Sequence, residues 1–342
     1  MDKRVFIRTA VAAAAVFTAG QGFAQQVTLR LHQMLPPQAT IPARALIPWA
    51  QKVEKDSAGR IKVQLFHAMQ LGGAPPQLFD QAKDGVVDLT WTVLGYTPGR
   101  FNKSEVFELP FMTTTAEASS KAFHEYVEKF AADEFKDVKV IAVHTHGPGL
   151  FHTKEPVTGL EALRGMKVRG GSRIINNMLT KLGATPVGMP VPAVTEALSK
   201  GVIDGTTIPW EVTPALKVSQ LVHNHTTFAG KYGLYTQTFV FAMNKASYEK
   251  LPADLKKVID ANSGIEAAAM LGRAMDQGDV AGREIAVKAG NKIVALDINE
   301  TQRWRRTAAT VETDWVNEMK GKGIDGEKLA AEARALIEKH SR

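Results

Sequence analysis

Residues 165–172 read GMKVRGGS and contain the sharpest candidate for chemistry in the chain. The segment comes within one residue of the phosphate-binding P-loop, which requires a lysine where Gly171 stands. Because that lysine is missing and MKV is typical of a strand, we do not expect a nucleotide site. A short strand MKVR would instead carry Arg169 to its end, where the planar guanidinium can donate two parallel hydrogen bonds to a carboxylate. On the local sequence alone, a surface salt bridge remains the alternative.

The chain lacks the sequence signatures of common catalytic and metal sites. It contains no G-x-S-x-G, H-E-x-x-H or D-x-D-x-D-G segment. His144 and His146 alternate on a predicted strand and share one face, but no third ligand is near, so we expect no metal and no cofactor. Asp88, Asp204 and Glu211 are scattered over different predicted elements, and the two aspartates fit a role in accepting backbone donors in turns. These observations favour a binding protein over an enzyme.

The first 24 residues have the pattern of a secretory signal peptide. Lys3, Arg4 and Arg8 form a charged start, the apolar run TAVAAAAVFTAG follows, and small residues lead to a cleavage site after Ala24. The apolar run is short for a membrane span, and no later stretch reaches about 18 apolar residues. We therefore expect an exported, soluble mature chain.

Composition excludes several classes of protein. The net charge of +7 falls to +5 without residues 1–24, which is a modest surplus for a nucleic-acid binder. The dense basic run at Arg303, Arg305 and Arg306 is typical of a solvated helix surface, so we expect no nucleic-acid partner. The absence of cysteine removes disulfides, thiolate metal sites and cysteine nucleophiles together.

Two series of α/β units are predicted along the chain. In the first, alternating strands at 26–34 and 60–67 flank a helix within 42–59, and a second helix at 75–85 leads to a strand at 86–94. This order of strand, helix and strand indicates a parallel α/β lobe.

The second series repeats a feature of the first. Residues 82–91 (AKDGVVDLTW) and 198–207 (LSKGVIDGTT) both combine a helix end, a capping glycine, an apolar pair and an aspartate. Two lobes of similar construction are therefore expected, with residues 91–96 and 206–210 facing a cleft beyond the strand ends. Proline is absent after Pro252, and we expect that region to be helical throughout.

Several segments, in this order and spacing, resemble the DctP-like solute-binding proteins of tripartite ATP-independent periplasmic (TRAP) transporters. The resemblance spans essentially the whole mature chain. Its marks are MQLGG (69–73), KDGVVDLTW (83–91), FELPFM (107–112), LRGMKVRGGS (163–172), LGATPVGMPVPAVTEALSKGVIDG (182–205) and MNKASYEKLPADLKKVI (243–259).

The resemblance implies an α/β, two-lobed periplasmic binding protein fold with a ligand cleft between the lobes and long C-terminal helices. Lobe I would comprise residues 25–147 and about 237–270, and lobe II residues 148–236. The helices of about 271–342 would brace both lobes, mainly lobe II. The protein would be a monomer that captures an organic carboxylate in the periplasm and delivers it to a TRAP membrane permease.

Two departures from the family pattern narrow the expected ligand. Arg169 falls on the family's carboxylate-binding arginine, but residues 206–210 read TTIPW where many relatives have a polar Q-E-N-P segment. Many relatives have a second arginine near the start of the second lobe, whereas this chain has Gly-Pro-Gly at 147–149. Such a pocket would leave extra polar groups of a ligand unpaired. We therefore expect a hydrophobic or aromatic monocarboxylate, with a 2-oxo or hydroxy acid included. The alternatives are the same fold binding a polar or dicarboxylic acid, or a sensory receptor.

The residues expected to contact the ligand come from both lobes. Arg169 would bind the carboxylate, and the remaining residues would form an apolar wall, offer hydrogen bonds to a hydroxyl or keto group, or complete the lining. These are Trp91, Ile208 and Trp210 for the wall, Tyr96, His146 and His152 for the hydrogen bonds, and Met34 and Val191 for the lining. Packing of Trp210 in the lobe core remains an alternative. We expect the hinge near residues 145–150 and 230–240.

Overall fold

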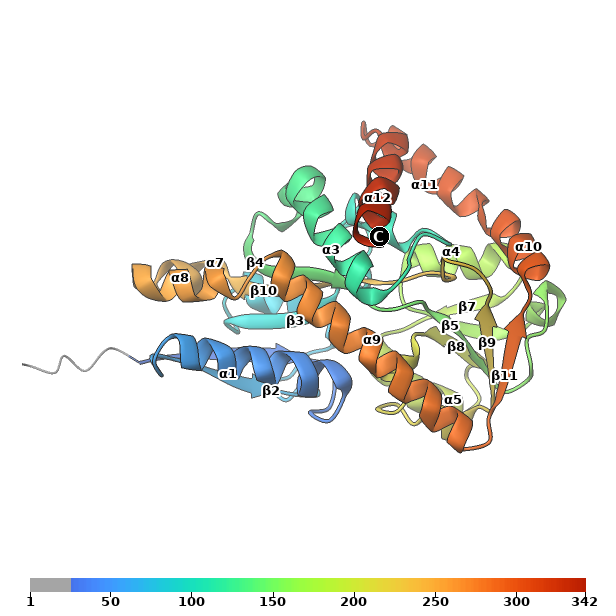
Figure 1. Cartoon of the computed structure of the whole chain (residues 1–342), viewed down its shortest axis with the longest axis horizontal. Coiled ribbons are helices and arrows are strands. Elements are labelled where there is room, and N and C mark those ends of the chain that lie inside the picture. The colour runs from blue at the N-terminus through green and yellow to red at the C-terminus, as the bar shows by residue number, and fades with distance from the viewer. Residues whose placement is uncertain (1–25) are drawn as a thin grey trace, which may run out of the picture.

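The computed structural model describes residues 26–342 and shows two lobes, each built around its own β-sheet (Figure 1). Helices cover both sheets, and three long helices follow at the C-terminus. The predicted two-lobed α/β fold is therefore confirmed. The predicted signal peptide, residues 1–24, lies outside the described residues.

The first lobe holds a five-stranded sheet of mixed direction. Its strands are β1 (Val27–Gln33), β2 (Ile61–Phe66), β3 (Leu89–Val93), β4 (Val138–Thr145) and β10 (Thr238–Asn244), and its helices are α1 (Ile47–Asp56), α2 (Leu78–Lys83), α3 (Ala116–Tyr126), α7 (Lys245–Glu249) and α8 (Ala253–Ala261). The strand order is β2-β1-β3-β10-β4. β1 is parallel to β2 and β3, whereas β10 is antiparallel to β3 and β4. The lobe is thus completed by a strand that returns from the second half of the chain.

The second lobe holds a six-stranded sheet. Its strands are β5 (Leu150–Thr153), β6 (Lys167–Gly170), β7 (Thr185–Gly188), β8 (Gly205–Ile208), β9 (Asn224–Phe228) and β11 (Lys292–Leu296), and its helices are α4 (Arg173–Lys181), α5 (Val194–Ser199) and α6 (Val218–Leu221). The order is β11-β9-β5-β8-β6-β7, with β6 parallel to its neighbours β7 and β8. The parallel pairing brings the carboxyl ends of β6 and β8 to the same edge of the sheet.

The two lobes use their equivalent aspartates in the same way. Asp88 Oδ2 accepts a hydrogen bond from the backbone N–H of Arg30 at 2.8 Å, and Asp204 Oδ2 accepts one from Lys167 N–H at 2.8 Å. Both aspartates accept backbone donors, as predicted, but the donors belong to the neighbouring strand rather than to the aspartate's own turn. Each carboxylate therefore fixes the register of the strand beside it.

The chain crosses between the lobes after β4 and again before β10. Gly149 and Tyr235 form an isolated antiparallel bridge that joins the two crossing segments. A Cβ atom at Gly149 would lie 2.1 Å from the ring of Tyr235, so only glycine fits at this approach. Both crossings fall within the ranges in which we expect the hinge, and the hinge motion itself stays a prediction.

A third connection is the 24-residue helix α9 (Ile265–Lys288), which runs diagonally from one lobe to the other in Figure 1. On the first lobe, Asp276 accepts hydrogen bonds from the N–H groups of Ala116 and Glu117 at 2.7 and 2.9 Å. On the second lobe, Asp279 accepts one from Glu211 N–H at 2.7 Å. The two carboxylates lie one turn apart on the helix, so α9 is anchored to both lobes at its middle.

Glycines allow α9 to approach both lobes closely. A Cβ at Gly272 would lie 2.6 Å from the Cα atom of Glu117 at the start of α3, and one at Gly282 would lie 2.1 Å from the carbonyl oxygen of Trp210. Because both obstacles are backbone atoms, they cannot move aside as the end of a side chain can.

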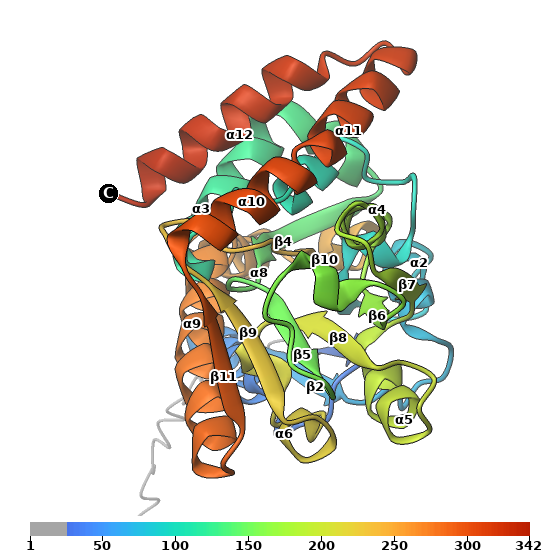
Figure 2. The same cartoon turned by 90° about the vertical axis from the view of Figure 1, so that its right-hand side faces the viewer.

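The C-terminal helices α10 (Ile298–Ala308), α11 (Thr310–Gly321) and α12 (Gly326–His340) form the upper layer of Figure 2. α11 packs on α4 of the second lobe, and α12 packs on α3 of the first. The buried rings of Trp304 and Trp315 belong to the core beneath them. These helices therefore join the two lobes on the side opposite to α5 and α6 (Figure 2).

The expectation that the chain is helical throughout after Pro252 is wrong at one segment. Residues 292–296 form strand β11, which pairs in parallel with β9 from Lys292 opposite Asn224 onward. Gly290 has a φ of +77°, which ends the preceding helix, and the β-branched Ile293 and Val294 then favour an extended chain. Among the described residues, no helix combines the length and apolar character needed to cross a membrane.

The close approach of α9 to α3 predicts a large effect of a side chain at position 272. Gly272→Leu should lower the free energy of unfolding by about 3 kcal/mol, because the side chain must displace the backbone of α3. Gly321→Leu is a matched control, since Gly321 also lies in a helix and a Cβ there meets no atom within 4 Å. Chemical denaturation measures both, and equal stabilities of the two variants would contradict this packing.

Candidate ligand-binding site

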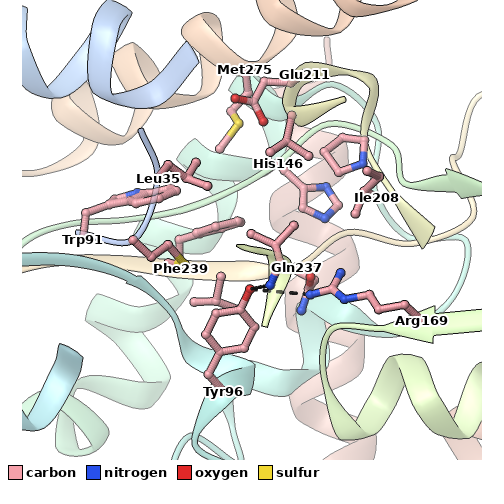
Figure 3. Close-up of a pocket in the computed structure, with 15 residues that line it drawn as sticks. Leu35, Trp91, Tyr96, His146, Arg169, Ile208, Glu211, Gln237, Phe239 and Met275 are labelled. Carbon is pink, nitrogen blue, oxygen red and sulfur yellow. Dashed lines mark hydrogen bonds between the residues drawn. The ribbon is translucent and has the colours of Figure 1, made fainter. Parts of the chain in front are cut away.

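A cavity lies between the two lobes at the ends of their strands (Figure 3). The space among the atoms that line it amounts to about 380 Å³, a figure that includes its opening to solvent. Residues of both lobes and of α9 line it: Met34, Leu35, Trp91, Val93, Tyr96, His146, Arg169, Val191, Ile208, Pro209, Glu211, Val212, Gln237, Phe239 and Met275. The cavity therefore occupies the predicted cleft.

Arg169 is fully buried in the second lobe, with 0% of its surface exposed. Its Nε donates to the carbonyl oxygen of Met189 at 2.9 Å, its Nη1 to that of Thr207 at 3.3 Å, and its Nη2 to the hydroxyl of Tyr96 at 3.5 Å. Tyr96 in turn accepts a hydrogen bond from Val191 N–H at 2.8 Å. A guanidinium has five N–H hydrogens, and the three bonds described here use three of them. One hydrogen on Nη1 and one on Nη2 are therefore directed to none of these three partners.

The glycines that follow Arg169 make room for side chains rather than for a phosphate. A Cβ at Gly170 would lie 2.1 Å from Asn176 Oδ1, and one at Gly171 would lie 2.2 Å from Gln237 Oε1. Gln237 belongs to the chain entering β10 of the first lobe, so Gly171 allows the two lobes to touch beside Arg169. The absence of a side chain at 171 therefore brings the amide of Gln237 next to the guanidinium (Figure 3).

One side of the cavity is an apolar wall. The rings of Trp91 and Phe239, on the neighbouring strands β3 and β10, stack with centroids 5.2 Å apart and an interplanar angle of 13°. The indole N–H of Trp91 donates to His144 Nε2 at 2.8 Å, so its polar atom is satisfied behind the wall. Ile208 contributes an aliphatic surface from the second lobe. This combination can accept an aromatic ring.

Three buried polar atoms belong to residues that line the cavity and have no hydrogen-bond partner within residues 26–342. They are His146 Nε2, Glu211 Oε1 and Gln237 Nε2. A buried polar group without a partner costs about 1–3 kcal/mol, so three at one cavity indicate a place prepared for a polar ligand. Gln237 was not found by sequence reasoning, and Glu211 was considered only as an acid or base.

Burial controls the ionisation of the titratable groups in the cavity. Burial, with a smaller contribution from the positive charge of Arg169, lowers the pKa of His146 to about 3, so its imidazole is neutral at pH 7. Burial likewise raises the pKa of Glu211 to about 7. Burial also raises the pKa of the Tyr96 phenol, an effect that Arg169 partly opposes, so Tyr96 is a neutral hydroxyl.

Seven of the nine predicted contact residues line the cavity, and these include Arg169 and Ile208. Trp210 and His152 are not among the residues that line the cavity. Trp210 belongs to a buried hydrophobic cluster, which is the alternative left open above, whereas the expectation for His152 is corrected. The ring of Trp210 packs at 5.0 Å from that of His152 and at 4.7 Å from that of His225. His152 also contacts the carbonyl oxygen of Ile208 at 3.1 Å. Pro209 separates Ile208 from Trp210 and begins a change of direction, so the two side chains face opposite sides of the wall.

His144 lies on β4, and His146 directly follows the end of that strand. Within the part of the chain that the structure describes, no three or more histidine or acidic side chains come together in a way that could hold a metal ion. His144 is buried behind Trp91, and His146 lines the cavity.

Comparison with known sequences agrees with this fold and site. A sequence model of the bacterial extracellular solute-binding proteins of family 7, DctP, matches residues 32–318. The chain belongs to this family of solute-binding proteins.

Solved structures of TRAP solute-binding proteins are similar to the whole described chain. One from Rhodoferax ferrireducens T118, in complex with copurified benzoate, is 52% identical, with a TM-score of 0.91 and coverage of 92% of this chain and 99% of that one. One from a marine metagenome, with co-crystallized 3-hydroxybenzoate, is 48% identical, with a TM-score of 0.92 and coverage of 93% and 100%. One from Bordetella bronchiseptica, with bound (R)- and (S)-mandelate, is 33% identical, with a TM-score of 0.84 and coverage of 92% and 99%.

The raised pKa of Glu211 predicts how its replacement changes stability with pH. The folded protein binds this proton more tightly than the unfolded chain, so the contribution of Glu211 to stability is lost as the pH rises from about 4.5 to about 7. Glu211→Gln cannot ionise. Its free energy of unfolding relative to wild type should therefore increase between about pH 5 and pH 8, by about 1.4 kcal/mol per unit of pKa shift.

Denaturation at several pH values measures this difference. Glu54→Gln makes the same substitution at an exposed position and is the control for it. Burial, helped by the negative charge of Glu211, raises the pKa of the Asp279 carboxyl, so the measured difference includes the response of Asp279. A difference for Glu211→Gln that does not change with pH would contradict the buried, raised-pKa state.

Proposed function

We propose that this protein captures an aromatic monocarboxylate in the interlobe cavity and delivers it to a TRAP membrane permease. The observation that carries the proposal is Arg169, a fully buried cation with an unused hydrogen on each Nη atom, set beside an apolar wall. A carboxylate can accept both hydrogens and neutralise the charge. The amide of Gln237 offers a further donor next to the same position.

The rest of the cavity suits a ring. An aromatic ring inserted beside Trp91 and Phe239 would be removed from water on both faces, with Ile208 opposite. At about 25 cal/mol per Å² of apolar area, burial of a phenyl-sized group contributes a few kcal/mol. The benzoate, 3-hydroxybenzoate and mandelate bound to the similar proteins share this combination of one carboxylate and one ring.

The charge of the cavity argues against the alternative of a dicarboxylate. Among the described residues that line it, Arg169 is the one permanent cation, and Glu211 is a potential anion. A second carboxylate would be desolvated without a counter-charge, at a cost of several kcal/mol. The family and the ligand-binding cavity support a transport function without turnover. The proposal includes export to the periplasm and a monomeric protein. A sensory role for the same fold would bind the same ligands but would not need the permease.

Replacement of Arg169 tests the carboxylate contact. Arg169→Met keeps much of the side-chain length but removes the charge, so the affinity for benzoate should fall at least about 100-fold. Isothermal titration calorimetry measures this, and thermal denaturation without ligand verifies the fold. Arg164→Met, which changes an exposed arginine five residues earlier, is the control and should bind as wild type does. Micromolar benzoate binding by Arg169→Met would remove this residue from the site.

Replacement of Ile208 tests the apolar wall. Ile208→Asn places an amide against the ligand ring, so the affinity for benzoate should fall about 10-fold or more. Val202→Asn makes a similar change at an exposed position outside the cavity and should leave binding unaltered. The same calorimetric titration compares the two variants. Equal affinities would show that Ile208 does not meet the ligand.

A further inference from the structure

The carboxylate and ring of the proposed ligand leave two polar groups of the cavity unused. These are His146 Nε2 and Glu211 Oε1, which are both buried and have no hydrogen-bond partner in residues 26–342. In Figure 3, Glu211 lies at the end of the pocket opposite Tyr96, and His146 lies between Glu211 and Arg169. The polar groups therefore continue past Arg169 along one side of the cavity, opposite the wall of Trp91 and Phe239.

The hydrogen bonds of His146 define what its free nitrogen can do. Nδ1 lies within hydrogen-bond distance of the carbonyl oxygen of Gly147, which can only accept, so Nδ1 carries the hydrogen. Because the buried ring is neutral, Nε2 is then an acceptor without a hydrogen. A carboxylate oxygen cannot bind there, since it is an acceptor too. The group that fits Nε2 is a hydrogen-bond donor on the ligand.

Glu211 supplies the complementary hydrogen. Its carboxyl lacks an ion-pair partner among the described residues and, being buried, has a pKa of about 7, so a large fraction is protonated at neutral pH. A ligand carboxylate at Arg169 adds negative charge to the cavity and favours the protonated form further. A protonated carboxyl can donate to an oxygen atom. A hydroxyl group both donates one hydrogen and accepts another, and it thus matches the pair of His146 and Glu211.

We propose that His146 and Glu211 form a hydroxyl-binding subsite, and that the preferred ligand is an aromatic acid carrying a hydroxyl group. The hydroxyl donates to His146 Nε2 and accepts from Glu211, while the carboxylate of the same ligand binds Arg169. This inference rests on the proposed function and deepens it. His146 and Glu211 then select among aromatic acids that Arg169 and the apolar wall would bind alike.

The experiment compares ligands that differ only in the donor. Dissociation constants are measured by calorimetry for benzoate, for 2-, 3- and 4-hydroxybenzoate, and for the corresponding methoxybenzoates, which keep the oxygen but lack the hydrogen. At least one hydroxybenzoate should bind wild-type protein about 10-fold or more tightly than benzoate. Its methoxy analogue should lose this advantage.

Two substitutions then assign the advantage to His146. In His146→Phe, which keeps an aromatic ring without a nitrogen, the ratio of benzoate to hydroxybenzoate dissociation constants should fall to about 1. His146→Gln, whose amide oxygen can reach a position similar to that of Nε2, should retain part of the ratio. A ratio in His146→Phe that equals the wild-type ratio would overturn the subsite.

A measurement on the wild-type protein keeps the proposal testable if His146→Phe does not fold. The ¹⁵N resonance of His146 Nε2 should be that of an unprotonated nitrogen, and it should shift with the hydroxylated acid but not with benzoate. Binding of benzoate with no gain from any hydroxyl would overturn the subsite and leave the proposed function standing. Failure of every aromatic acid to bind would overturn both.

Discussion

The structure depends on a positive charge that the protein buries without an opposite charge. Within the described chain, Arg169 makes no ion pair, and it is held instead by two carbonyl oxygens and a tyrosine hydroxyl. These dipoles orient the guanidinium but do not neutralise it, so the charge remains costly until an anion arrives. The same contacts fix the orientation of the side chain. Met189, Thr207 and Tyr96 come from three separate segments, and the segments must meet before the arginine can be placed.

The frame around Arg169 is built from reciprocal contacts between backbone and side chain. Thr207 Oγ1 donates to the carbonyl oxygen of Arg169 at 3.1 Å while Arg169 donates to that of Thr207, so the ends of β6 and β8 are tied twice. Across the cleft, Tyr96 from the first lobe reaches both Arg169 and Val191 of the second lobe. The arginine is therefore a contact between the lobes as well as the proposed ligand contact. Nη2 of Arg169 thus has one hydrogen directed to Tyr96 across the cleft and a second that is not used by this contact.

The α/β units could be predicted from the sequence because their signals are local, whereas the role of Arg169 was implied by the family resemblance, since its local sequence also allowed a surface salt bridge. Alternating strands, glycine-capped helices and the run MKVR before two glycines each predict structure within about ten residues. The sequence is less informative where the direction of a side chain or of the backbone depends on a single residue or on a distant partner. The sequence allows Trp210 either in the cavity or in the lobe core, and in the structure its ring packs against His152 and His225 and does not line the cavity. β11 was missed because a short edge strand within a helical region gains its stability from β9, which is distant in sequence.

Gln237 and Glu211 show why polar cavity residues are harder to predict. Nothing in the segments around them distinguishes a side chain that faces a cavity from one that faces solvent. Their role becomes visible only when both lobes and α9 are assembled, because their partners and their burial come from elsewhere in the chain. Hydrophobic cavity residues are easier, since an apolar residue at a strand end is expected to be buried in any case.

The glycines of α9 have a mechanical consequence beyond close packing. Gly272, Gly278 and Gly282 all fall in the stretch where the helix passes from one lobe to the other, and each faces a neighbouring segment. Glycine also lowers the resistance of a helix to bending, because no side chain restricts its backbone. The stretch that contacts both lobes is thus also the one whose backbone is least restricted by its own side chains. The close packing and the low resistance to bending both arise from the missing Cβ atoms. A side chain introduced at one of these glycines would therefore restrict the helix backbone as well as clash with the neighbouring segment.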